Sequence, residues 1–153
     1  MARIITYPSV TPVVGDYLVG TQKTTSGNQT NPTKNFTVGD VVNAGLGYKV
    51  YSALLTQAGT DNPTVDELKN NTTATMTWTR VGVGQYRCTA SSNVFTTNKT
   101  QVFVNVGTAP NGPGSFVEWN TNTSYVEINT YNISGTSSDD LIDKGSLEIR
   151  IYS

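Results

Sequence analysis

The sequence contains no histidine and a single cysteine, Cys88. Without histidine, the chain cannot build a serine–histidine triad, a histidine general base or most zinc and iron sites. One cysteine cannot form an intramolecular disulfide, which fits folding in a reducing cytoplasm. The chain also lacks the G-x-S-x-G, Walker and G-x-G-x-x-G motifs. We therefore predict that the protein is not an enzyme and has no catalytic residue, cofactor or metal.

Charged residues are also scarce, at 14% of the 153-residue chain, and the net charge is −1. Nucleic-acid binding needs clustered Lys and Arg to neutralise phosphates, and electrostatic membrane binding needs a similar basic run. No apolar run reaches the roughly 18 residues that cross a bilayer, and the first residues lack the apolar centre of a signal peptide. We therefore expect neither a nucleic-acid partner nor a membrane partner.

Thr, Asn and 14 Gly take the place of charged residues. Thr suits strands because its branched Cβ packs well on a pleated surface, whereas Asn and Gly suit turns. The clearest pattern is "TATMTWTRVGVGQYRCTA", in which an apolar face that includes Trp78 alternates with Thr, and a turn at Gly82 and Gly84 precedes the returning strand. This pattern predicts an antiparallel hairpin with Cys88 on its apolar face, as a core residue rather than a reactive thiol.

Other strand-like runs follow at short spacing after residue 46. They are "YKVYSALLT", "KTQVFVNVG", "SFVEWNT", "SYVEINTYNIS" and "LEIRIYS". The segment "TDNPTVDELKNN" is predicted to be a loop with one helical turn, capped by Thr64 and Glu67. Six or seven such strands predict an all-β fold, an antiparallel β-sandwich or jelly-roll-like domain over residues 46–153.

The preceding residues, 1–45, are predicted to form a small β-hairpin and short-helix arm for attachment or oligomerisation. "VVGDYLVGTQ" has the character of a strand, and "KNFTVGDVVNAG" that of a strand leading into a helix. Thr37 and Asp40 have the spacing of an N-cap and an acidic residue in the first turn, and Gly45 is expected to end the helix. The polar stretch 23–33 is the expected connection between the strands.

Two groups of carboxylates are the only candidates for chemistry. Asp139, Asp140 and Asp143 form an acidic cluster without the spacing of a calcium loop, so we interpret them as a solvated turn. Glu118 and Glu127 could face each other on neighbouring strands, as the paired carboxylates of glycosidases do. Each lies in an alternating strand, however, where an outward polar side chain is the simpler interpretation.

Aromatic rings that stack on sugars give an alternative function. Six residues are candidates for such a platform: Tyr48, Tyr51, Trp78, Trp119, Tyr125 and Tyr131. Trp78, together with Met76, fits the core better than the surface. A carbohydrate or cell-surface binding module, with host surface glycans as its partner, therefore stays open.

Several of these segments resemble structural proteins of tailed bacteriophages. "DYLVGTQ…NPTKNFTVGDVV" resembles an N-terminal element of phage fibre and appendage proteins, and "YKVYSALLTQAGT" with "TWTRVGVGQYRCTA…FTTNKTQVFV" is similar to a small β-domain of phage structural proteins. The resemblance implies a virion protein made in the bacterial host cytoplasm: a head fibre, a capsid decoration, or a tail or baseplate appendage. It also implies a homotrimer that contacts capsid, portal or tail components. The chain has no collagen-like or coiled-coil shaft, which favours a short decoration protein or adaptor.

The apolar residues of the arm are the predicted contact site. An arm of about 45 residues is too small to bury its own apolar side chains. The candidates for oligomer or virion docking are Tyr17, Leu18, Val19, Phe36, Val38 and Val41. We expect copies of the arm to pack around a symmetry axis or to dock on the virion. The alternative is that the arm packs against its own β-domain.

Overall fold

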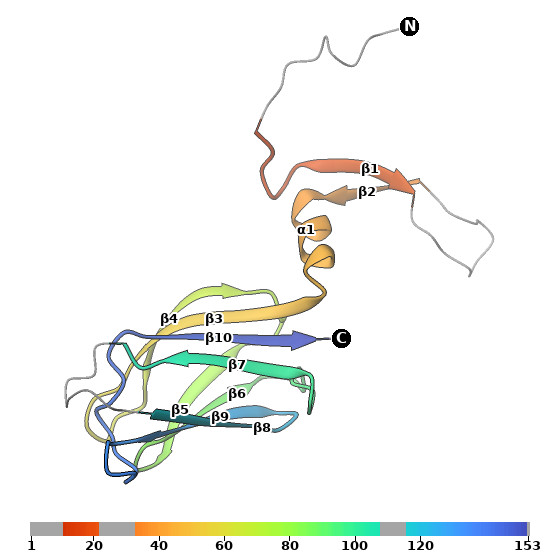
Figure 1. Cartoon of the computed structure of the whole chain (residues 1–153). Coiled ribbons are helices and arrows are strands. Elements are labelled where there is room, and N and C mark those ends of the chain that lie inside the picture. The colour runs from red at the N-terminus through yellow and green to blue at the C-terminus, as the bar shows by residue number, and fades with distance from the viewer. Residues whose placement is uncertain (1–10, 22–32, 108–115, 153) are drawn as a thin grey trace, which may run out of the picture. The chain divides into compact units, whose positions relative to one another are not determined.

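The computed structural model describes residues 11–21, 33–107 and 116–152. The chain divides into two compact units, Met1–Gly47 and Tyr48–Ser153, so the division follows Gly47 rather than residue 45. The first unit contains a two-stranded sheet and a short helix, and the second contains two four-stranded sheets (Figure 1).

The first unit is a hairpin that leads directly into a helix. Strands β1 (Tyr17–Thr21) and β2 (Thr33–Thr37) are antiparallel, and α1 (Val38–Leu46) follows β2 without a break. The Thr37 hydroxyl accepts a hydrogen bond from the Asp40 amide at 3.0 Å and donates one to the Asp40 carboxylate at 2.7 Å. The predicted N-cap is therefore confirmed. The predicted polar connection lies, apart from Thr33, outside the described residues.

The helix ends later than predicted. Gly45 lies inside α1, and the helix continues to Leu46. Gly47 then adopts the left-handed conformation, with φ of 69°, which ends the run of helical hydrogen bonds. The prediction for Gly45 was wrong because a glycine weakens a helix but ends it only where its backbone leaves the helical region.

A short turn before β1 fixes the start of α1. The Asp16 amide donates to the Val13 carbonyl at 3.0 Å, and the Val13 amide donates to the Asp16 carboxylate at 2.9 Å. The carbonyls of Asp16 and Val14 accept hydrogen bonds from the amides of Val38 and Gly39, at 2.8 Å and 3.0 Å. With the Thr37 cap, these contacts satisfy the amides of the first helical turn, which would otherwise lack partners.

The second unit is an antiparallel β-sandwich, which confirms the predicted all-β fold. The β3/β10 sheet has the order β4 (Thr64–Asn70), β3 (Tyr48–Thr56), β10 (Gly145–Tyr152) and β7 (Thr100–Asn105). The β6/β9 sheet has the order β5 (Met76–Gly82), β6 (Gln85–Ala90), β9 (Tyr125–Tyr131) and β8 (Phe116–Thr121). The last strand, β10, therefore lies between β3 and β7, which come much earlier in the sequence.

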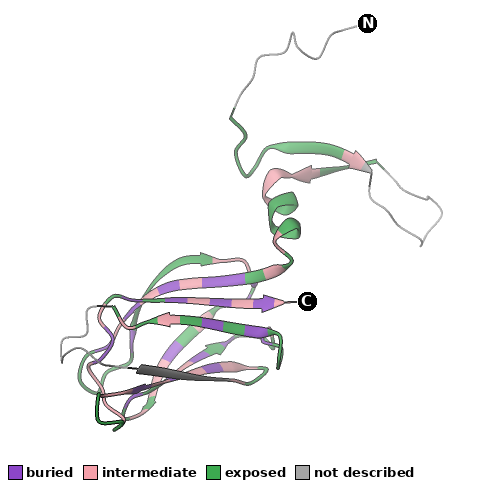
Figure 2. Ribbon diagram, viewed as in Figure 1, coloured by how far each residue is buried: buried purple, intermediate pink, exposed green. Residues whose placement is uncertain are grey.

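The core lies between the two sheets. Buried and less buried residues alternate along β10 and β7, as expected when one face of a strand is covered (Figure 2). The predicted hairpin is confirmed as β5 and β6, with Trp78 opposite Cys88 and both side chains buried. Gly84 in its turn has φ of 64°, and a Cβ there would lie 2.6 Å from the Thr130 carbonyl, so only glycine fits.

Strand β4 corrects the prediction of a loop with a helical turn from Thr64 to Glu67. It pairs with β3, with a register shift between Ser52 and Ala53. Its side chains from residue 64 to 69 are all exposed. Because neither face of the strand is covered, its sequence lacks the alternation of apolar and polar residues by which a half-buried strand is recognised. Backbone pairing with β3 forms this strand, and it adds one strand beyond the six or seven predicted for the β-domain.

Candidate assembly site

The first unit exposes most of its described apolar side chains. None of the residues described in this unit is buried. Tyr17 and Val19 on β1 are 72% and 75% exposed, and Val42 on α1 is 56% exposed. Side chains of this size usually lie in a core, so their exposure makes this unit a candidate contact site.

The hairpin carries apolar side chains on both of its faces. Leu18 and Phe36 are direct cross-strand neighbours, so they share a face. The Phe36 ring covers Gly20, where an added Cβ would lie 3.2 Å from the ring. Tyr17 and Val19 belong to the other face because side chains alternate along a strand. The structure thus brings Leu18 and Phe36 together and separates them from Tyr17 and Val19.

Helix α1 adds an apolar stripe to this unit. Val38, Val41 and Val42 are spaced at i, i+3 and i+4, which places them on one side of the helix. Val38 is half-buried, and the other two are exposed. Val42 was not among the predicted contact residues, although its spacing of four from Val38 was the available signal. An isolated helix of nine residues is marginal, and the exposed valines make this stripe a candidate contact surface.

The acidic cluster has a structural role in the second unit. The guanidinium of Arg80 binds the Asp139 carboxylate with two nitrogens, at 3.0 Å and 2.7 Å. The Gly84 amide donates to the same carboxylate at 2.9 Å. The prediction of a solvated turn was therefore wrong for Asp139. The Arg80 contact holds the pKa of Asp139 below its ordinary value of 3.8.

This ion pair belongs to a larger polar network. The Tyr86 hydroxyl lies 3.0 Å from the Asp139 carboxylate and 2.8 Å from the side-chain oxygen of buried Gln57. The Asp140 amide donates to the same Gln57 oxygen at 2.8 Å. Burial and the neighbouring carboxylate raise the pKa of Tyr86. Over the described residues, no group of three His, Cys, Asp or Glu side chains could hold a metal ion.

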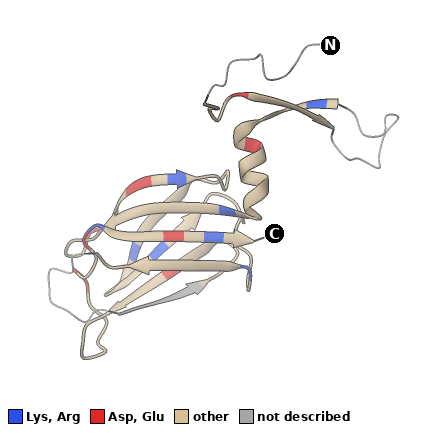
Figure 3. Cartoon of the chain, turned by 45° about the horizontal axis from the view of Figure 1, so that its top comes forward, with Lys and Arg blue, Asp and Glu red and all other residues tan. Residues whose placement is uncertain are grey.

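The two glutamates proposed as a carboxylate pair are diagonal neighbours. Strand register places Glu118 opposite Asn129 and Glu127 opposite Asn120, and the Glu118 side chain lies outside the described part. The Glu127 carboxylate is bound by Arg87, with nitrogen–oxygen distances of 2.8 Å and 3.1 Å. Acidic and basic residues are sparse over the described strands (Figure 3). The Glu127 carboxylate is therefore engaged in an ion pair with Arg87 and does not form a pair with a second carboxylate.

The aromatic residues do not form a single platform. Tyr51 and Trp78 are buried, and the Trp78 indole donates to the Tyr51 hydroxyl at 3.2 Å. Burial raises the pKa of Tyr51 to about 12. The prediction of Trp78 and Met76 as core residues is confirmed, whereas Tyr51 is excluded from any sugar platform. Two other candidates are half-buried. The Tyr48 ring centre lies 5.3 Å from that of Tyr152, and the Arg87 guanidinium lies over the Tyr125 ring at 4.2 Å.

The last two platform candidates lie on neighbouring strands of the β6/β9 sheet. Tyr131 is half-buried at the end of β9. Register places Trp119 opposite the buried Ile128, and its side chain lies outside those described. Neither residue is adjacent in register to Tyr48, which belongs to the other sheet.

Cys88 is confirmed as a core residue, with no exposed surface. Burial raises the pKa of its thiol to about 12. Because the thiolate is the reactive form, we expect a disulfide reagent to modify Cys88 at least about tenfold more slowly in native protein than in guanidinium chloride. Absorbance of the released aromatic thiol measures both rates. Equal rates would show that the core opens freely.

Comparison of the chain with protein-family models, with curated proteins and with solved structures finds no match. Among the described helices, none has the length and apolar character to span a membrane. The class of protein is described by its fold: a β-sandwich unit and a hairpin-and-helix unit with exposed apolar side chains.

Proposed function

We propose that this chain is a non-enzymatic structural component of a tailed-phage virion and acts through symmetric assembly of its arm. The observation that carries the proposal is the exposure of Tyr17, Val19 and Val42 in a unit with no buried described residue. The likeness of residues 16–42 to phage fibre and appendage proteins supports the phage assignment. The sandwich supports a structural role because its carboxylates at Asp139 and Glu127 serve ion pairs.

The arm offers enough apolar surface for association. Full burial of one large apolar side chain contributes roughly 1.5–3 kcal/mol, and association costs roughly 4–15 kcal/mol. One side chain is therefore insufficient, but the exposed set of the hairpin and helix together reaches the required range. This set comprises Tyr17, Leu18, Val19, Val41 and Val42. A symmetric contact covers, in every copy at once, the members of this set that lie on the contacting face of the arm.

The proposed assembly is a homotrimer in the virion. Its role would be that of a head fibre, a capsid decoration, or a tail or baseplate appendage. The other partners would be capsid, portal or tail components, which the arm contacts on its remaining apolar face. A hairpin with two apolar faces suits this arrangement because one face can serve self-association and the other docking.

Light scattering on a sizing column tests the assembly. We expect a mass of about 49 kDa, three times the 16.4 kDa chain. A mass of 16.4 kDa at micromolar concentration would contradict self-assembly. Immunogold labelling of particles purified from an infected culture tests the virion assignment separately, and unlabelled particles would contradict it.

A further inference from the structure

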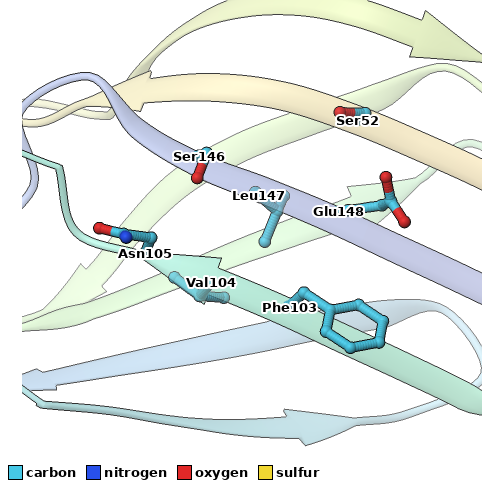
Figure 4. Close-up of a pocket in the computed structure, with 7 residues that line it drawn as sticks. All are labelled: Ser52, Phe103, Val104, Asn105, Ser146, Leu147 and Glu148. Atoms are coloured by element: carbon cyan, nitrogen blue, oxygen red, sulfur yellow. The ribbon is translucent and has the colours of Figure 1, made fainter.

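The outer face of the β3/β10 sheet carries a shallow hollow of about 300 Å³. Strands β3, β7 and β10 contribute its lining (Figure 4). The polar and aromatic residues that line it are Ser52, Phe103, Asn105, Ser146 and Glu148. The hollow belongs to the second unit and is distinct from the apolar surface of the arm.

Strand register explains the hollow. Glu148 on the central strand lies between Ser52 and Phe103, and Ser146 lies opposite Asn105. Opposed residues of an antiparallel pair point to the same face, so these side chains form two adjacent rows. The small serines leave space beside the larger Phe103 and Glu148. The volume is at the lower end of the range for small-molecule sites.

Neighbouring groups hold the two largest side chains of the hollow in place. The Arg150 guanidinium lies 2.5 Å from a Glu148 oxygen. The same guanidinium lies 4.7 Å from the centre of the Phe103 ring and 5.1 Å from that of Tyr48. Cation–π contacts on two rings restrict the arginine and, through it, the carboxylate. These contacts restrict the Phe103 ring and the Glu148 carboxylate before any ligand binds.

The chemistry of the hollow matches a sugar. Phe103 is 48% exposed on the sheet surface, so its ring can contact the C–H face of a pyranose. The Asn105 side-chain oxygen accepts from the Gly107 amide at 2.9 Å, which directs the amide nitrogen, a donor, away from that contact. The Glu148 carboxylate and the Ser146 hydroxyl supply acceptors and a further donor. One aromatic wall with a few convergent polar groups is the usual composition of a small-ligand site.

The charge of the hollow favours a neutral ligand. Glu148 is the only charged residue among those that line it, and Arg150 neutralises this carboxylate at contact distance. An acidic sugar would find no cation among the lining residues, and a cation would compete with Arg150 for the Glu148 carboxylate. We propose that this hollow binds a neutral saccharide, with Phe103 against the sugar ring and Glu148, Asn105 and Ser146 at its hydroxyls.

A glycan array tests the site with the full-length chain. The array carries neutral oligosaccharides of glucose, galactose and N-acetylglucosamine beside sialylated and uronic-acid glycans. We expect binding to neutral glycans, and Ser146→Leu, which fills the hollow, should weaken it about tenfold or more. Phe103→Ala should have a similar effect, whereas Phe103→Trp should retain binding. The matched control is Thr89→Leu, at an exposed position on the β6/β9 sheet.

The outcomes separate this site from the arm. Thermal melting confirms that each variant is folded, and light scattering should give Ser146→Leu the mass of the unmodified protein. Absence of binding to every neutral glycan, binding to acidic glycans alone, or full binding by both Ser146→Leu and Phe103→Ala would overturn the proposal. Loss of binding in the Thr89→Leu control as well would place the contact elsewhere on the sandwich.

Discussion

Replacing Phe36 with Asp is expected to convert the assembled protein into monomers while the β-sandwich stays folded. The Phe36 ring lies opposite Leu18 and over Gly20 on one face of the hairpin. A carboxylate at this position would be buried without a partner if copies of the arm pack together, which costs several kcal/mol per copy. Around a symmetry axis, the introduced carboxylates would also repel one another. Light scattering should show the mass fall from about 49 kDa to 16.4 kDa.

The matched control for this variant is Leu68→Asp. Leu68 is 63% exposed on β4, so the substitution introduces the same charge at an exposed apolar residue of the other unit. This variant should keep the assembled mass. Circular dichroism should show unchanged strand content in both variants. An assembled Phe36→Asp protein would show that this face of the arm is not the contact.

Replacing Asp139 with Asn is expected to destabilise the β-sandwich by about 3 kcal/mol. The carboxylate accepts from Arg80, Gly84 and Tyr86. An amide keeps one acceptor and turns a donor toward the guanidinium, which loses its counter-ion. For a domain of this size, the loss corresponds to a fall in melting temperature of roughly 13 °C. Calorimetry measures it, with Asp66→Asn on the exposed edge strand β4 as the control.

The same variant should also change how stability depends on pH. Because the pKa of Asp139 is lowered in the folded protein, its contribution is fully present above the ordinary value of 3.8. The contribution is lost as the pH falls from about 4 through the lowered pKa of the folded state. We expect the unfolding free energy of Asp139→Asn to fall less in this range. Parallel acid profiles for the two proteins would contradict this assignment.

The parts of the fold that follow local rules could be predicted from the sequence. The β5–β6 hairpin was predictable because apolar residues and Thr alternate on both sides of the turn at Gly84. Strand β4 was not, because it lies at a sheet edge with exposed side chains and depends on pairing with β3. The Asp139 network was also missed, since its partners Arg80 and Tyr86 are distant in sequence and meet only in the folded sandwich.

The proposed contact residues could be identified from the sequence as a group, but their arrangement on the hairpin could not. The sequence shows an arm that is too short to cover Phe36 and its apolar neighbours, so these residues were identified as a group. Strand register determines which of them share a face of the hairpin: Leu18 lies on the same face as Phe36, and Tyr17 and Val19 lie on the opposite face. The hollow beside Phe103 had no sequence signal, because Ser146 and Glu148 are ordinary outward residues until three strands align them.

The position of β10 has a consequence for biosynthesis. The ribosome makes this strand after the other described strands of the sandwich, yet it occupies the middle of its sheet, between β3 and β7. While it is still in the exit tunnel, β3 can pair with β4, but the other edge of β3 and the adjoining edge of β7 have no partner. Such open edges favour pairing with other nascent chains. The sandwich therefore closes only after β10 has left the exit tunnel, in a late step that joins distant parts of the chain.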